Sequence, residues 1–190
     1  VCQQEPSPTY QFNDVNFSES TALVNWISQF NLLCVSKFNM GFIGSSHFVG
    51  YVLGALTILR LGDIYGRRPV CAFSTLVGGI VILIMYFVHQ LWALYLLLMF
   101  TGMFYLAKGS LLYLYMLELV PENRRGRLHV ISSIFSSCLG ICTIGFFSFV
   151  HNANQLLIIM GTLSIMHLLV LYMVPESPKF LYANKRWDEL

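Results

Sequence analysis

The sequence predicts an all-α membrane protein, a polytopic bundle of transmembrane helices. Of its 190 residues, 56% are hydrophobic and only 11% are charged, whereas soluble domains carry about 25% charged residues. The charges are also clustered, because no Asp, Glu, Lys or Arg occurs in residues 38–59, 69–107 or 128–175. A chain with this pattern cannot cover its surface with polar groups, and it needs lipid around it.

Each charge-free stretch holds helices of about 20 apolar residues, the length that crosses a bilayer. The first stretch holds one span, and the other two are divided by polar residues, His89 and Gln90 in one and residues 151–155 in the other. The third span carries a lysine inside it. We therefore expect a loop over residues 1–38, spans over about 40–59, 70–88, 91–117, 129–150 and 156–174, and the beginning of a polar loop over 175–190.

The basic residues predict the orientation of the spans, since Lys and Arg concentrate in short cytoplasmic loops. Nine of the eleven basic residues follow the first, third or fifth span, and only Lys37 and Lys108 do not. We expect residues 1–38 on the extracellular or lumenal side and the C-terminus in the cytoplasm. A net charge of +2 is too small and too scattered to indicate nucleic-acid binding.

No pattern in the sequence indicates an enzyme. It contains no Gly-rich phosphate loop, no set of metal ligands and no nucleophile paired with a base, so we expect neither a metal nor a cofactor. Asn16 opens a glycosylation sequon in the predicted outer loop. Cys2 and Cys34 share this loop, where a disulfide is permitted, either between them or with other cysteines. Because the chain begins at Val1 and residues 185–190 look like the first turn of another helix, we expect a fragment.

Three short motifs lie at predicted cytoplasmic boundaries. Residues 61–69 read Leu-Gly-Asp-Ile-Tyr-Gly-Arg-Arg-Pro, which resembles the loop between helices 2 and 3 of major facilitator transporters. Residues 118–126 resemble the acid, proline and Arg-Gly element of sugar porters and organic ion transporters. Residues 175–181 resemble the Pro-Glu-Ser-Pro-Arg-Trp-Leu ending of helix 6. All three occur in order, separated by the right number of spans.

Within that superfamily, residues 29–34 resemble a segment of the organic cation and anion transporters, which include carnitine carriers. The resemblance implies helices 2 to 6 of a twelve-helix major facilitator fold, with helix 1 and the C-terminal half lying outside this sequence. It also implies secondary active or facilitative transport of a small organic ion, either a cation, a carnitine-like zwitterion or an anion. The plasma membrane is the implied location. The partners would be the lipid bilayer, the substrate and the rest of the same protein.

The resemblance further implies a charge network that holds a cytoplasmic gate shut in one transport state. Its expected members lie in the three motifs, and each is either a charged residue or a glycine; they are Asp63, Gly66, Arg67, Arg68, Glu118, Arg124, Arg125, Gly126 and Glu176. The alternative for the arginines is that they only enforce topology. The family usually has glycine where Leu59 stands and a basic residue where Ile64 stands, so this gate departs from the pattern.

Lys108 is the residue of the third span that most needs an explanation. Near mid-bilayer, a lysine costs at least about 2.5 kcal/mol unless it is hydrated or paired. In the implied fold this helix lines the central cavity, so Lys108 is a candidate contact for an anionic substrate or a proton-coupled acid. The alternative is a lysine that snorkels to the membrane interface or is paired structurally. Other candidates for the cavity are aromatic side chains that could stack on an organic cation; they are Tyr51, Tyr105, Tyr113 and Phe135. His47 is a further candidate, as an ionisable side chain within the first span.

Glycines and serines at four-residue spacing, such as Gly50 and Gly54, predict close packing between helices rather than a binding site. Two alternatives to organic ion transport stay open. One is a sugar porter of the same superfamily, and the other is a structural or regulatory relative that has lost transport. A receptor or channel with five or more spans would not explain the three ordered motifs.

Overall fold

The computed structural model describes residues 35–150 and 153–184, together with Phe30 and Leu32. Five helices among these residues are long and apolar enough to cross a membrane, and the predicted all-α membrane bundle is confirmed. The expected glycosylation site at Asn16 and the expected disulfide of Cys2 and Cys34 lie outside the described residues. So do residues 185–190.

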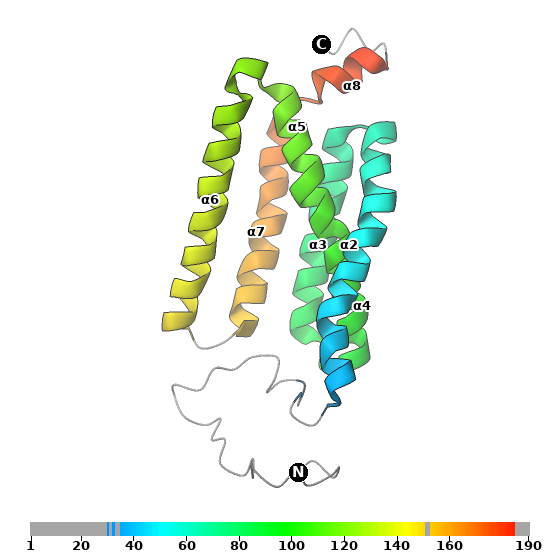
Figure 1. Cartoon of the computed structure of the whole chain (residues 1–190), viewed down its shortest axis with the longest axis vertical. Coiled ribbons are helices and arrows are strands. Elements are labelled where there is room, and N and C mark those ends of the chain that lie inside the picture. The colour runs from blue at the N-terminus through cyan, green and yellow to red at the C-terminus, as the bar shows by residue number, and fades with distance from the viewer. Residues whose placement is uncertain (1–29, 31, 33–34, 151–152, 185–190) are drawn as a thin grey trace, which may run out of the picture.

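The spans follow one another with short connections (Figure 1). The helices are α2 (Lys37–Tyr65), α3 (Arg67–Phe87), α4 (Leu91–Leu106), the π-helical turn η3 (Ala107–Leu111), α5 (Leu112–Leu119), α6 (Glu122–Phe149), α7 (Ala153–Met173) and the short α8 (Pro178–Ala183). Together α4, η3 and α5 make the single span Leu91–Leu119. Several helices run beyond the charge-free stretches, because charged side chains at a helix end can reach the water outside the hydrocarbon.

The turn between α2 and α3 consists of one residue. Gly66 has a φ of +105°, a conformation that residues with a Cβ avoid. It directly links Tyr65, the last residue of α2, to Arg67, the first residue of α3. At its other end, α2 begins after Ser36, whose hydroxyl accepts a hydrogen bond from the Asn39 amide at 3.3 Å, as expected of an N-cap serine.

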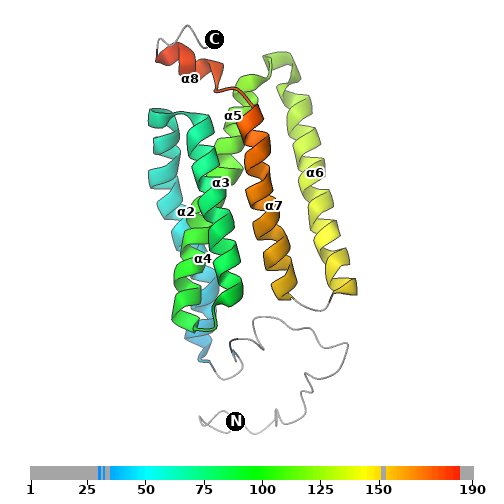
Figure 2. The same cartoon turned by 180° about the vertical axis from the view of Figure 1, so that it is seen from behind.

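The helices pack mainly in two pairs, α2 with α4 and α3 with α7. Figures 1 and 2 show α6 at the edge of the bundle beside α7, and α6 contains no buried residue. The α2–α3 turn, the α5–α6 turn and α8 all lie at one end of the bundle (Figure 1). We call this the charged end, because the three sequence motifs are there.

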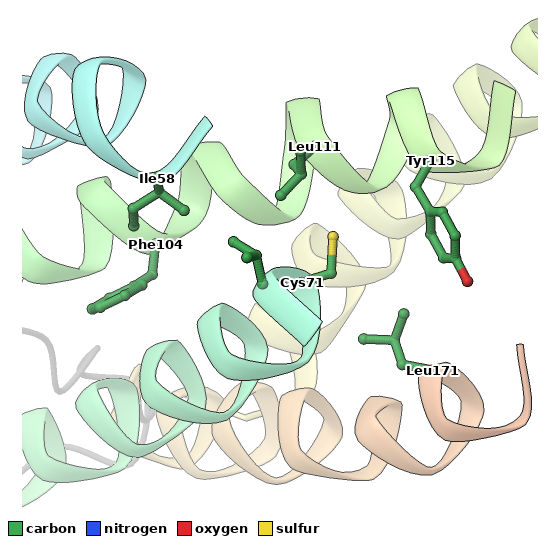
Figure 3. Packing of buried hydrophobic residues seen from close by; sticks show 7 residues of the cluster. Ile58, Cys71, Phe104, Leu111, Tyr115 and Leu171 are labelled. Carbon is green, nitrogen blue, oxygen red and sulfur yellow. The ribbon is translucent and has the colours of Figure 1, made fainter. Parts of the chain in front are cut away.

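A buried cluster joins the two helix pairs near the charged end. Its members come from α2, α3, the third span and α7; they are Ile58, Val70, Cys71, Phe104, Leu111, Tyr115 and Leu171. Figure 3 shows Cys71, Tyr115 and Leu171 approaching one another from three helices. Because lipid is as apolar as these side chains, their close packing is what holds the helices together. The cluster thereby fixes the helix ends that carry the charged motifs.

Candidate functional site

Arg67 lies at the centre of the charged end. Its guanidinium is 2.9 Å from the carboxylate of Asp63, which lies four residues earlier at the end of α2, and 3.4 Å from the Glu118 carboxylate of α5. The side chains of Arg67 and Glu118 are 13% and 8% exposed, whereas that of Asp63 is 65% exposed. The Arg67–Glu118 pair is therefore buried, and the Arg67–Asp63 pair is open to solvent.

Glu118 also connects α5 to the segment between α7 and α8. Its second carboxylate oxygen accepts a hydrogen bond from the Ser177 hydroxyl at 2.6 Å. The ammonium of Lys179 in α8 lies 4.0 Å from the first oxygen. A small cavity of about 120 Å³ remains among Asp63, Arg67, Glu118 and the beginning of α8. One buried carboxylate thus holds three parts of the chain together.

Glu176 caps α3. Its carboxylate accepts hydrogen bonds from the backbone amides of Arg67 at 3.2 Å and Arg68 at 3.1 Å, and from the amide of Ser177 at 2.9 Å. The first amides of a helix have no partner within it and favour a negative charge. A Cβ on Gly66 would come within 2.9 Å of this carboxylate, so both the backbone conformation and the space require glycine there.

Arg68 fastens α3 to α7. Its guanidinium donates a hydrogen bond to the carbonyl oxygen of Tyr172 at 2.5 Å and lies 5.3 Å from the centre of the Tyr172 ring, a cation–π distance. The hydroxyl of Tyr115, which is 1% exposed, donates a hydrogen bond to the carbonyl oxygen of Pro175. These bonds hold the end of α7 against α3 and α5.

Replacing Tyr115 by phenylalanine is expected to destabilise the protein by about 1 kcal/mol, because the substitution removes one buried hydrogen bond and keeps the ring. Thermal unfolding of the purified full-length protein in detergent measures the change. Tyr172→Phe is the matched control, since Tyr172 is exposed and acts through its carbonyl and ring. Equal melting temperatures for the two variants would contradict this role of the Tyr115 hydroxyl.

The structure does not bring every predicted gate residue into this network. Arg125 instead closes the end of α5, donating hydrogen bonds from Nε to the carbonyl oxygens of Leu117 at 3.2 Å and Val120 at 3.3 Å. Cationic side chains commonly satisfy the last carbonyls of a helix in this way. Arg124 and Gly126 are exposed in the first turns of α6, and Arg124 is in none of the ion pairs found among the described residues.

The structure does not bring the predicted cavity residues together in one place. Lys108 and Tyr113 line a cavity of about 550 Å³ between the η3–α5 segment and α6. On the other side of the third span, the rings of His47 and Tyr105 lie 6.0 Å apart, and Tyr51 follows His47 one turn along α2. Phe135 is 66% exposed and does not line the cavity.

The residues that contact predicted site residues but were themselves not predicted as site residues include Ser177, Lys179, Tyr172 and Ser164. The Ser177 hydroxyl binds Glu118, and the Ser164 hydroxyl accepts a hydrogen bond from the Lys108 ammonium at 2.5 Å. Ser177 and Lys179 had a signal in the sequence, because both lie in the third motif. Over residues 35–150 and 153–184, no group of three or more His, Cys, Asp or Glu side chains could hold a metal ion.

The amino-acid sequence of the chain is similar to those of known transporters. Residues 4–189 match the family model described as sugar (and other) transporter. The chain is 29% identical over 171 residues to an organic cation/carnitine transporter 2 of Arabidopsis thaliana, covering 87% of this chain and 32% of that protein. It is 25% identical to an organic cation transporter-like protein of Drosophila melanogaster, covering 90% of this chain and 30% of the relative. A facilitated glucose transporter, member 6 of solute carrier family 2 of Mus musculus, is 29% identical, with 83% and 31% covered. The chain thus spans about a third of the length of these relatives.

Proposed function

The chain belongs to the sugar (and other) transporter family, and we propose that the complete protein carries small organic ions across a membrane by alternating access. Substrate would bind between two halves of the bundle, which expose it to one side and then to the other. The observation that carries the proposal is Arg67, which links α3 both to an exposed carboxylate, Asp63, and to a buried one, Glu118.

This pairing suits a gate at the charged end. The exposed Asp63–Arg67 link contributes at most about 1 kcal/mol, so it can break and reform as the halves move. The buried Arg67–Glu118 link is costly to break, so it supports the rigid part of the half. Asp63 is thereby the residue that can exchange partners with a second half, while Glu118 and Glu176 hold the helix ends in place.

The topology forms part of the proposal. The charged end would face the cytoplasm, with residues 1–38 outside, because the basic residues concentrate at the charged end. A preceding helix 1 and a C-terminal half would complete the transporter, which agrees with relatives about three times as long as this chain. The protein would be a plasma-membrane glycoprotein carrying sugar on Asn16. No covalent chemistry is needed.

Sugar transport is the second candidate function. It is favoured by the similarity to the mouse facilitated glucose transporter. That protein and the Arabidopsis organic cation/carnitine transporter have the same sequence identity to this chain, 29%. Two of the three relatives compared carry organic cation transport in their names, and we therefore place organic ions first. A relative that keeps the fold without transport would show neither activity.

Uptake of a labelled panel by cells expressing the complete open reading frame tests the proposal. The panel contains carnitine, tetraethylammonium, benzoate and glucose, and the Asp63→Asn variant is assayed beside the unmodified protein. We expect saturable uptake of an organic ion, reduced in the variant at equal surface abundance because the exchangeable charge at the gate is lost. Glucose uptake alone would select the sugar porter. Absence of all uptake by folded surface protein would overturn transport of these substrates.

A further inference from the structure

An apolar pocket lies between α2 and α3, next to the Gly66 turn. Its volume of about 390 Å³ falls within the range of small-molecule sites, roughly 300–1,000 Å³. The lining comes from α2, α3 and α4; the residues are Ile58, Leu61, Tyr65, Pro69, Val70, Phe73, Met103 and Phe104. Figure 3 shows two of them, Ile58 and Phe104, where the pocket meets the buried cluster. Leu61, Tyr65 and Phe73 are exposed, so the pocket opens onto the surface of the bundle.

The mouth of the pocket faces away from the proposed gate. Leu61 and Tyr65 each lie two residues from Asp63, which is about 200° around the helix, so they are on the opposite side of α2. Because the proposed gate turns Asp63 toward the second half of the transporter, Leu61 and Tyr65 turn toward the bilayer. Ile58 lies seven residues from Tyr65, or about 10 Å of helix rise. The pocket is therefore continuous with the lipid-facing surface, from the charged end into one leaflet.

The lining selects an uncharged ligand with very few polar atoms. No Asp, Glu, Lys, Arg or His lines the pocket, so a phosphate headgroup would find no cation there. The hydroxyl of Tyr65 is the one side-chain hydroxyl of the lining, and it makes no hydrogen bond within the described ranges. A ligand that complements this lining has an apolar body and a single hydroxyl group.

The aromatic rings of the lining favour a rigid, flat body. The rings of Phe73 and Phe104 have centroids 6.2 Å apart and planes at 73°, and Tyr65 adds a third ring toward the charged end. A fused-ring ligand can pack on such faces without losing much conformational freedom, whereas a flexible acyl chain must be ordered when it binds. Among membrane lipids, a sterol combines this rigid body with a single hydroxyl.

The sequence of the α2–α3 turn supplies a second observation. Leu61, Tyr65 and Arg67 follow the pattern of Leu or Val, then Tyr, then Lys or Arg, with one to five residues in each interval, which has been proposed for cholesterol contact. Such a pattern gains weight where its residues meet at one site. Leu61 and Tyr65 do line one pocket, whereas Arg67 pairs with Asp63 and Glu118 instead.

We propose that this pocket binds a membrane sterol, with the sterol hydroxyl at Tyr65 and the fused rings against Phe73 and Phe104. Tyr65 and Pro69 lie on the two sides of the Gly66 turn, so a bound sterol contacts both helices that the turn connects. It thereby stabilises the end of the bundle that carries the Asp63–Arg67 pair. The site depends on the proposed orientation of Asp63 but not on the identity of the transported substrate.

Photolabelling of the purified full-length protein tests this site. The probe is a cholesterol analogue that carries a photoreactive diazirine, and a photoreactive palmitate is the acyl-chain control. We expect the sterol probe to label residues 58–73, and excess cholesterol, but not palmitate, to prevent this labelling. Palmitate labelling that cholesterol does not reduce would overturn the sterol in favour of an acyl chain. Absence of labelling in folded protein would also overturn the site, because another part of the complete chain would cover the pocket.

Two tryptophan substitutions on α2 form a matched pair. Leu61→Trp fills the pocket and is expected to weaken cholesterol competition at least about tenfold, since the added ring overpacks the site. Ile64→Trp adds the same ring at an exposed residue that does not line the pocket, and it should leave competition unchanged. Cholesterol should raise the melting temperature of Ile64→Trp and of the unmodified protein, but not of Leu61→Trp. Equal behaviour of the two variants would overturn the pocket as the binding site.

Tyr65→Phe tests the hydroxyl alone and keeps the ring, so it serves even if Leu61→Trp does not fold. The expected loss of cholesterol affinity is about threefold to tenfold, the value of one hydrogen bond. Unchanged affinity would overturn the role of Tyr65.

The sterol site and the proposed transport fail in different ways. Sterol labelling of residues 58–73 without any uptake into cells would keep the site and overturn transport of the substrates tested. Saturable uptake by a protein that the sterol probe does not label would keep transport and overturn the site.

Discussion

Replacing Arg67 by methionine is expected to destabilise the protein by about 3–5 kcal/mol, because it leaves the buried Glu118 carboxylate without its cation. Glu118 would keep the Ser177 hydroxyl, but the remaining ammonium, Lys179, is 4.0 Å away and 79% exposed. Methionine preserves most of the length and apolar surface of the arginine side chain. The loss of charge is therefore the main change, and thermal unfolding of the detergent-purified full-length protein measures it.

Asp63→Asn is the matched control for this prediction. It removes the other ion pair of Arg67, but Asp63 is 65% exposed, so the expected change is below about 1 kcal/mol. Adding Glu118→Gln to Arg67→Met should restore part of the lost stability, because the buried charge disappears with its partner. Similar melting temperatures for Arg67→Met and Asp63→Asn would contradict the buried pair. This control also keeps the uptake assay interpretable, since a folded Asp63→Asn protein reports on the gate.

Replacing Gly50 by alanine is expected to destabilise the protein by about 2–3 kcal/mol, as overpacking does in tightly packed interiors. A Cβ on Gly50 would overlap the carbonyl group of Met99 in α4, and a Cβ on Gly102 would overlap the carbonyl group of His47 in α2. Backbone atoms cannot move aside as a flexible side chain can. The helices α2 and α4 would have to separate, and Gly102→Ala should behave like Gly50→Ala.

Gly44→Ala is the control on the same helix. A Cβ on Gly44 meets no atom within 4 Å, and alanine favours a helix by about 1 kcal/mol over glycine. Glycine to alanine at residue 44 is thus expected to stabilise the protein or leave its stability unchanged. The same substitution at residue 50 is expected to destabilise it. Folded yield after heating, measured by size-exclusion chromatography of the full-length protein, gives the comparison. A destabilised Gly44→Ala would show that glycine is needed there for another reason.

Sequence patterns located the charged end well and the cavity poorly. The motif residues Asp63, Arg67, Glu118 and Glu176 were expected to act together, and the structure brings them into one network. Arg125 shares a motif with Glu118, yet its side chain turns back to the end of α5. Membership of a motif could not distinguish a residue of the charge network from one that binds a helix end, because the difference depends on which way each side chain faces. The same reason explains why Lys108 and Tyr113 lie apart from His47 and Tyr105.

The sequence by itself predicted five spans, and five helices among the described residues are long and apolar enough to cross a membrane. Entry of a segment into lipid depends on the sum of local transfer free energies, which can be read residue by residue. Only the tertiary structure decided that Glu176 caps α3, that Ser177 binds Glu118 and that Lys108 reaches Ser164 on α7. These contacts join residues far apart in the chain, and they depend on how helices of similar hydrophobicity face one another. Packing and hydrogen bonding choose that arrangement, because the surrounding lipid does not distinguish among the apolar faces.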